Sequence, residues 1–352
     1  MRRTPVMLLL IFIFLLAAAV PARAGDNESL ELTLDDAVKK ALLRSESLKI
    51  SVLQLQQSED AKDSAAYALV RFNSNWAVEY TPGVEQYYVN REQASLNYEI
   101  AKKKYAAAAD GVVLAVHKAY YNVLKQEGQV KLAELAVASD EQKLNNGRLS
   151  FDLGLISRQA LKGLELQLAS SRAALTAARD SLDKAYIDLN LLVGLPESVR
   201  PSLVSTVEFS PYAGDLAVQQ GLALEESPTV VAAVEGARLQ EDLEGWSNDI
   251  SDEDIEIAKL QASSVKKQVK EAVRTLYNSV KAYEENYSTV QGNVSLAEEN
   301  LRVTQLKYEL GMATKNEVLE AEKSLADARQ KLLQLVLDHA YYKLALEKPW
   351  AM

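Results

Sequence analysis

The stretch that decides the fold is Tyr308-Glu309-Leu310-Gly311-Met312-Ala313-Thr314, near the C-terminal end of the chain. Gly311 can adopt the left-handed conformation with which many helices end, and Thr314 offers the side-chain oxygen that a following helix needs at its N-terminus. Small or apolar residues then recur at alternating steps of three and four, the repeat of helices that wind around each other: Val318, Ala321, Leu325, Ala328, Leu332 and Leu335. The stretch predicts two long antiparallel helices that turn at Gly311.

The same device occurs 157 residues earlier, at Asp152-Leu153-Gly154-Leu155-Ile156-Ser157. Ser157 is the capping residue there, and the alternating spacing continues at Leu161, Leu164, Leu168, Ser171, Leu175 and Ala178. Two such units in one chain predict a single body built from two structural repeats. We assign residues 25–194 to the first repeat, residues 195–214 to a linker and residues 215–352 to the second repeat.

Composition favours a mainly all-α fold. The chain has 352 residues, of which 48% are hydrophobic, 7% are aromatic and none is cysteine, which is typical of neither a β-sandwich nor a disulfide scaffold. No proline interrupts residues 91–151, so a helix there would be about 90 Å long. Further helical patterns lie at 33–72, 157–193 and from 215 to about 347 with a break near Trp246, and residues 203–209 are compatible with one strand.

The first 24 residues have the pattern of a secretory signal peptide. Arg2 and Arg3 precede an apolar run from Val6 to Val20, and Ala22-Arg23-Ala24 resembles a cleavage site. The run is shorter than the roughly 20 residues that span a bilayer as a helix. Export would leave 36 basic and 49 acidic residues, and a surface this negative argues against binding to nucleic acid.

No catalytic, cofactor or metal site can be assembled from the sequence. His117 and His339 stand alone, and no cysteine could join them in a zinc site. Phosphate-binding loops and nucleophile elbows are absent as motifs. We therefore expect no enzymatic activity, no cofactor and no metal, and we expect His339, at a seam position, to be a packing residue.

Residues 76–89 differ in kind from the helical patterns. Trp76–Thr81 and Val84–Val89 are β-branched and aromatic, and Pro82-Gly83 between them is a turn dipeptide, so the segment predicts a short β-hairpin. The second repeat is shorter at the corresponding place, where an acidic stretch, Trp246–Glu253, stands instead.

The chain resembles the TolC-type outer-membrane efflux proteins over nearly its whole mature length. The resemblance rests on the duplicated plan, on residues 119–124 (Ala-Tyr-Tyr-Asn-Val-Leu), and on Tyr308-x-x-Gly311 followed by Glu317-Val318-Leu319-Glu320-Ala321. It implies a homotrimer whose helices form a hollow α-helical barrel across the periplasm. One end would normally be a β-barrel in the outer membrane, built from two hairpins per chain, and the other would meet an adaptor protein of an inner-membrane pump.

The sequence departs from this family at the membrane end. A transmembrane strand needs about 9–11 residues, whereas the predicted hairpin has about six a side and its counterpart is missing. Either the hairpin is a vestige of the barrel or the protein does not cross an outer membrane by itself. We therefore expect an exported protein of the outer membrane or periplasm and leave its contact with the membrane open.

The resemblance also implies roles for three residues beside the second tip. Glu317 and Glu320 match acidic positions that ring the periplasmic entrance of the tunnel, and like charges held close there would raise their pKa values. The alternative is a solvated helix start, where glutamates are favoured anyway. Tyr308 matches a position that helps to lock the entrance, but the companion arginine is replaced by Ala313; its alternative role is packing in the seam.

The two tips are the predicted docking surface for the adaptor. An apolar residue follows each glycine, and exposed apolar residues favour binding to a partner. The proposed tip residues are Gly154, Leu155, Ser157, Gly311, Met312 and Thr314. The alternative is that they only turn the chain.

Two functions follow from this sequence. The first is a passive, trimeric exit duct of a tripartite efflux or secretion system, through which small molecules or proteins leave the cell. The second is an exported coiled-coil spacer or adaptor of the cell envelope without channel activity. The β-rich flanks of an adaptor are missing from the sequence, so we rank the exit duct first.

Overall fold

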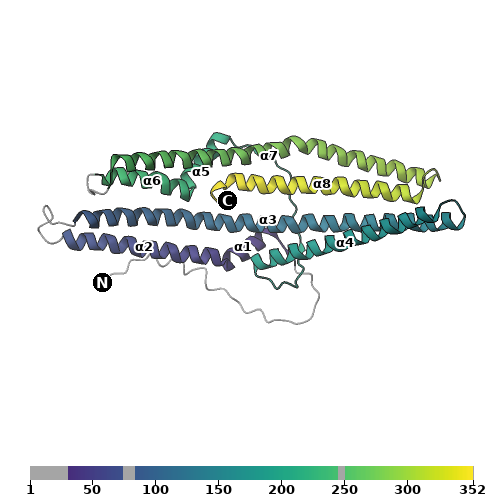
Figure 1. Cartoon of the computed structure of the whole chain (residues 1–352), viewed down its shortest axis with the longest axis horizontal. Helices are drawn as coiled ribbons and strands as arrows, with labels where there is room; N and C mark the ends of the chain where they lie inside the picture. Colours follow the sequence, from purple (N-terminus) through teal and green to yellow (C-terminus); the bar gives the residue numbers. More distant parts are fainter. Residues whose placement is uncertain (1–30, 74–83, 245–249, 352) are drawn as a thin grey trace.

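The computed structural model describes residues 31–73, 84–244 and 250–351, and the molecule is a long rod of helices (Figure 1). The predicted mainly all-α fold with duplicated helical hairpins is confirmed. The expected signal peptide lies outside the described residues. Within the described ranges, no helix has the length and apolarity that a membrane crossing requires.

The first half of the chain contains four helices: α1 (Leu34–Arg44), α2 (Glu46–Asn73), α3 (Val84–Asp152) and α4 (Arg158–Val193). α3 runs nearly the whole length of the molecule, as its long proline-free sequence predicts. α2 packs along its first part and α4 returns along its last part (Figure 1). α4 ends where Gly194 takes a left-handed conformation, with φ of 73°.

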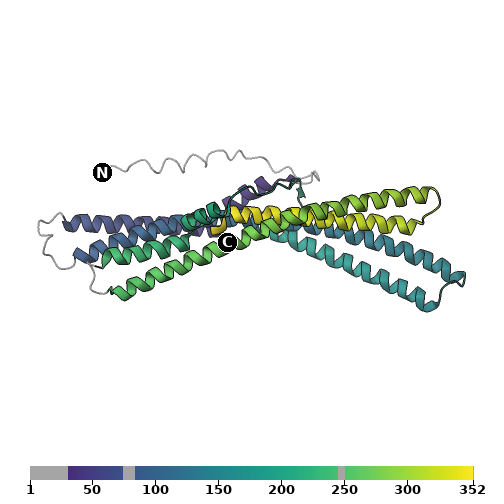
Figure 2. The ribbon, with the colours of Figure 1, turned by 90° about the horizontal axis from the view of Figure 1, so that it is seen from above.

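The second half repeats this plan with α5 (Leu216–Glu226), α6 (Pro228–Leu243), α7 (Asp252–Glu309) and α8 (Lys315–Glu347). α6 packs along the first part of α7, and α8 returns along its last part, so the α3–α4 and α7–α8 turns lie at the same end of the rod (Figure 1). Seen from above, the two hairpins diverge toward these turns (Figure 2).

A band of short elements joins the two halves at the middle of the rod. β1 (Glu31–Leu32) pairs in parallel with β2 (Ser202–Leu203), and a short 3₁₀ helix, η3 (Pro349–Ala351), packs on α3. The buried Tyr120 hydroxyl of α3 donates to the carbonyl of Leu32 (3.0 Å) and accepts from the backbone N–H of Ser205 (3.2 Å). The sequence predicts a strand at residues 203–209, but β2 includes only Leu203 of them. Its partner β1 has two residues, because Thr33 already caps α1.

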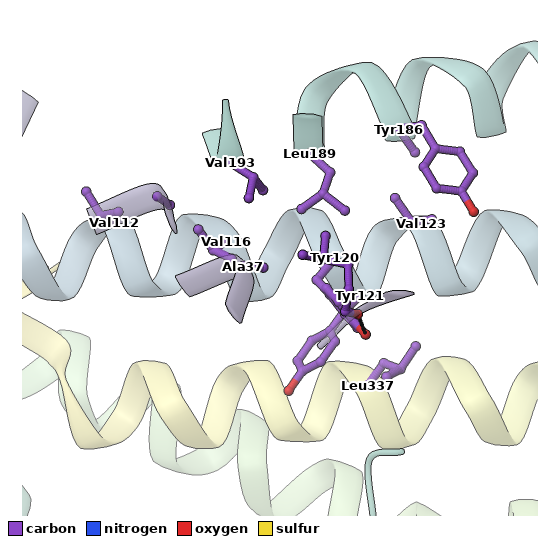
Figure 3. Packing of buried hydrophobic residues seen from close by; sticks show 13 residues of the cluster. Ala37, Val112, Val116, Tyr120, Tyr121, Val123, Tyr186, Leu189, Val193 and Leu337 are labelled. Atoms are coloured by element: carbon purple, nitrogen blue, oxygen red, sulfur yellow. Dashed lines mark hydrogen bonds between the residues drawn. The ribbon is translucent and has the colours of Figure 1, made fainter. Parts of the chain in front are cut away.

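The largest apolar core lies beside this band. Val112, Val116, Tyr120 and Val123 of α3 face α1, α4 and α8, as the close view shows (Figure 3). Buried side chains from those helices complete the cluster, among them Ala37, Leu189 and Leu337. The broadest burial is therefore at the middle, while the hairpins beyond it are held by narrower seams.

The prediction of a β-hairpin at residues 76–89 is wrong for its second strand. Val84–Val89 form the first turns of α3, and Trp76–Thr81 lie outside the described residues. Strand propensity depends on context, and here the good helix formers that follow extend their helix backward through the β-branched and aromatic residues. A hydrogen bond from Gln86 Nε2 to Asn90 Oδ1 (2.9 Å), one helical turn apart, supports this start.

Candidate functional site

The two tips have the same backbone geometry. Gly154 has φ of 72°, and the next N–H, that of Leu155, donates to the Ser150 carbonyl over 2.8 Å. At the second tip Gly311 has φ of 70°, and Met312 donates to the Lys307 carbonyl over 2.7 Å. This is the bond that closes a helix on a left-handed glycine. The sequence prediction of a glycine turn is met at both tips.

The caps of the returning helices are also as predicted. The Ser157 hydroxyl accepts from the Ala160 N–H (3.1 Å), and the Thr314 hydroxyl accepts from the Glu317 N–H (3.3 Å). Ser157 and Thr314 thus begin α4 and α8. Each tip residue that the sequence singled out for docking takes part in, or lies within, one of these two turns.

Apolar side chains are exposed at the extreme end of both tips. Leu155 and Met312, the residues after the glycines, are each 73% exposed, and Leu153 and Leu310 before the glycines are similarly exposed. Burying these side chains would release apolar surface from water, which favours association. Turning the chain requires the glycines but not these large apolar residues.

Glu317 belongs to the start of its own helix. Its Oε2 accepts from the Thr314 N–H (2.6 Å) and from the Thr314 hydroxyl (2.9 Å), which completes a capping box. The hydrogen bond from the Thr314 backbone, followed by the one from its side chain, holds the pKa of Glu317 below its usual value. Its hydrogen-bond donors are neutral groups, and the positive charge of Lys307 adds a smaller effect in the same direction.

Glu320 reaches instead to the other hairpin. Its Oε1 accepts from Lys143 Nζ and from the Ser139 hydroxyl of α3, each over 2.6 Å. The hydrogen bond from Lys143, more than that from Ser139, lowers the pKa of Glu320. Within one chain, both glutamates have lowered pKa values, because each carboxylate has hydrogen-bond donors of its own. The raised values expected at the entrance depend on neighbouring copies of the chain and stay a prediction.

Tyr308 lies in the last turn of α7, and its side chain is 45% exposed. Its carbonyl accepts from the Gly311 N–H over 3.0 Å, so the backbone of this residue belongs to the turn. The side chain is therefore only partly covered within one chain.

Behind the first tip lies a polar cluster that the sequence reasoning missed. The nearly buried Asp140 of α3 accepts from the Ser171 hydroxyl and from Gln167 Nε2 (3.3 Å) of α4, and Lys143 Nζ lies 3.9 Å from its other oxygen. Lys143 thereby links Asp140 to Glu320. One signal was available, because Ser171 interrupts an otherwise apolar seam, and a buried hydroxyl requires a partner.

Comparison with known structures identifies the fold. The Campylobacter jejuni CmeC outer membrane channel has a TM-score of 0.68 and 14% identity, over 90% of this chain and 85% of that one. The Vibrio cholerae outer membrane protein VceC gives 0.60 and 16%, over 90% and 95%. The open state of the Neisseria gonorrhoeae MtrE outer membrane channel gives 0.60 and 18%, over 90% and 88%. No curated protein sequence matches with significance.

Residues 243–349 match the family model described as Outer membrane efflux protein, a segment that contains α7, the Gly311 tip and α8. The fold is that of these outer membrane channels, and the match to the family model covers the second helical hairpin. The matched family is that of the outer membrane efflux proteins, and CmeC and MtrE are outer membrane channels.

Both histidines have partners. His339 is buried, with Nε2 3.4 Å from Glu284 Oε1 and its ring against Phe209, while His117 Nδ1 lies 3.3 Å from the Tyr121 hydroxyl. Burial lowers the pKa of each histidine. Among the described residues, no group of His, Cys, Asp and Glu side chains is arranged to hold a metal ion.

Proposed function

We propose that the chain is a TolC-type protein and acts as a passive exit duct of an efflux or secretion system. Three copies would enclose a water-filled path lined by helices, and the energy for export would come from a pump. The observation that carries this proposal is the pair of long hairpins whose tips, equal in backbone geometry, lie at one end of the rod (Figure 1). Such a pair, repeated by threefold symmetry, forms a ring of six hairpins.

Exposed apolar residues along the rod support the trimer. Ile50, Leu53, Tyr67 and Val70 of α2 are more than half exposed, as are Ile257, Leu260 and Leu296 of α7. Side chains of this kind on a long helix are typical of a surface that a neighbouring subunit covers. A homotrimer would bury them between adjacent copies.

The tips would be the docking end. Leu155 and Met312 present apolar surface there, and the tightly closed glycine turns hold them in fixed positions. We propose that a periplasmic adaptor, connected to an inner-membrane pump, binds at this end. Glu317, Glu320 and Tyr308 would then surround the entrance through which the exported compound passes.

Export and location are part of the same proposal. We propose that residues 1–24 direct the chain out of the cytoplasm and that the mature protein acts at the outer membrane or in the periplasm. The exit duct and the envelope spacer both fit such a location, so transport must be measured directly.

The test is the assembly and conductance of the full mature chain. Light scattering in mild detergent should give a mass of three chains, and reconstituted trimers should conduct ions. A stable, folded monomer would contradict the duct. A trimer that leaves lipid bilayers unchanged in conductance would favour the envelope spacer instead.

A further inference from the structure

The linker between the two halves is held against the second half by its backbone. It crosses the rod from the end of α4 to the start of α5 (Figure 1). The N–H of Tyr212 donates to Glu284 Oε1 of α7 (2.5 Å), and the Tyr212 carbonyl accepts from Lys281 Nζ of α7 (3.0 Å). We call the linker residues 209–212, which α7 and α8 hold in this way, the strap.

A buried histidine lies beneath the strap. Phe209 stacks on Tyr287 of α7, with ring centroids 3.7 Å apart, and its ring lies 4.7 Å from that of His339. His339 is only 2% exposed. One helical turn further along α8, Lys343 Nζ donates to the Ser210 carbonyl over 3.1 Å. The strap is therefore part of the cover that keeps water from His339.

Glu284 connects the histidine to the strap. Its Oε1, which accepts from the Tyr212 N–H, lies 3.4 Å from His339 Nε2, and its Oε2 accepts from Lys281 Nζ over 2.7 Å. Burial acts to raise the pKa of Glu284, but the hydrogen bonds from Lys281 and Tyr212 outweigh it, and the pKa lies below its usual value. The carboxylate therefore stays ionised in the pH range in which histidine titrates.

The charged groups that face His339 are of both signs. Burial lowers the pKa of His339, Glu284 acts in the opposite direction, and the positive charges of Lys343 and Lys281 lower it further. The net effect is a lowered pKa, so the covered site favours the neutral imidazole. An imidazolium in this place would lack hydration and would stand beside the two lysines that bind the strap.

We propose that the strap is a pH-sensitive device, held against α7 and α8 while His339 is neutral and released when His339 takes up a proton. A histidine freed of its cover has the ordinary pKa of 6.5, above that of the covered one. The held form is therefore fully stable above this value and loses stability as the pH falls toward the lower pKa of the covered histidine. Within that window each pH unit shifts the equilibrium toward release by up to about tenfold.

The matching junction of the first half is built from other groups. Leu182 stands 157 positions before His339. The carbonyl of Leu32, which stands 180 positions before Tyr212, accepts from the Tyr120 hydroxyl, where the strap has a lysine and a carboxylate as partners. Release by acid is therefore expected only in the second half.

A spin label beside the strap measures its release. The chain has no cysteine, so Glu208→Cys, at an exposed position next to the strap, carries one label per chain. Electron paramagnetic resonance spectra of the full mature chain should gain a mobile component as the pH falls from about 7.5 to about 5. Circular dichroism at each pH verifies that the helices remain.

Two substitutions in the labelled chain remove the titrating group. His339→Gln keeps a polar side chain near Glu284, and His339→Leu copies Leu182 of the first half. In both variants the mobile fraction should stay constant over the same pH range. The matched control is His117→Gln, since burial also lowers the pKa of His117, the other histidine of the chain; with His117 replaced, the pH response of the strap should remain.

A mobile fraction that does not change with pH while His339 is present would overturn the inference, as would an equal change in both His339 variants. A mobile component that appears only together with a loss of helix would also overturn it. The inference concerns a single chain. A monomer by light scattering whose strap responds to pH would contradict the proposed duct and leave this inference intact.

Discussion

The two hairpins have the same tip but different seams. In the α3–α4 hairpin, Asp140 and Ser171 face each other and form a hydrogen bond. The residues 157 positions later are Ala297 and Ala328, which pack with Val294 and Leu325 in an apolar cluster. The same glycine turn therefore forms beside a polar seam and beside an apolar one. The seam residues determine how each hairpin is stabilised and which groups it presents to the other hairpin.

The polar seam of the first hairpin is also connected to the second hairpin. Asp140 of the polar seam lies beside Lys143, and Lys143 reaches Glu320 of the apolar hairpin. The first hairpin therefore supplies both buried polarity and the cation that pairs with the second hairpin. A second contact between α3 and α8 lies nearer the middle, where Gln330 Nε2 donates to the Lys125 carbonyl over 2.9 Å.

The largest expected effect is the loss of stability when an aspartate, as at Asp140, is placed at the matching position of the apolar α7–α8 seam. Ala297→Asp places a carboxylate among Val294, Leu325 and Ala328 without a donor, and should lower the free energy of unfolding by about 3 kcal/mol. The double variant Ala297→Asp/Ala328→Ser should recover part of this loss. Thermal denaturation at fixed protein concentration measures both.

The exposed Ala169 of α4 provides the control for this transfer. Ala169→Asp adds the same charge at the surface and should change the midpoint little. If Ala297→Asp is equally well tolerated, then the second seam does not depend on being apolar.

The reverse exchange should have a smaller effect. Asp140→Ala leaves the buried Ser171 hydroxyl without its partner across the seam and should cost about 2 kcal/mol. Asp140→Ala/Ser171→Ala reproduces the alanine pair of the second hairpin and should lie closer to the unmodified protein than the single variant does. A double-mutant cycle by urea denaturation measures this coupling, and strictly additive effects would contradict it.

The shared tips should respond alike. Gly154→Ala and Gly311→Ala each force a side chain into a left-handed backbone and should destabilise by about 1 kcal/mol. Gly163→Ala, inside α4 with open space around it, should instead stabilise the protein by roughly 0.5–1 kcal/mol. Clearly unequal losses at the two tips, measured by denaturation, would show that the tips are not equivalent.

The smallest expected effect is a difference between the two tips in how their contribution to stability depends on pH. The lowered pKa of Glu317 means that its carboxylate stabilises the α8 start above the ordinary glutamate value of 4.5, and that this stabilisation is lost as the pH falls through the lower pKa of the folded protein. Glu317→Gln should therefore lose stability at neutral pH but not under strongly acidic conditions. Ala160→Gln, at the matching position of the first tip, should show no such pH dependence.

The features that the sequence predicts well are those that depend on neighbouring residues. Glycine turns at Gly154 and Gly311 and caps at Ser157 and Thr314 require only the residues around them, and each is observed. The long helices follow from the same local signals. The seams are also predictable, because residues such as Val318 and Leu325 are buried as their spacing predicts.

The features that the sequence misses depend on context at a distance. Val84–Val89 carry strand-forming residues, but the helix that follows extends through them. The pairing of Lys143 with Glu320 joins residues 177 positions apart, and their contact depends on how α3 crosses α8. Helix periodicity places each residue on a face but does not give the angle between two helices.

The central claim is that three chains gather their tips around one axis, and spin labels test it most directly. The chain has no cysteine, so Met312→Cys carries a label only at the second tip. Electron–electron dipolar spectroscopy on the assembled protein should give one well-defined distance with the modulation depth of three coupled spins. No dipolar modulation, in a folded sample with full labelling, would contradict the trimeric tunnel.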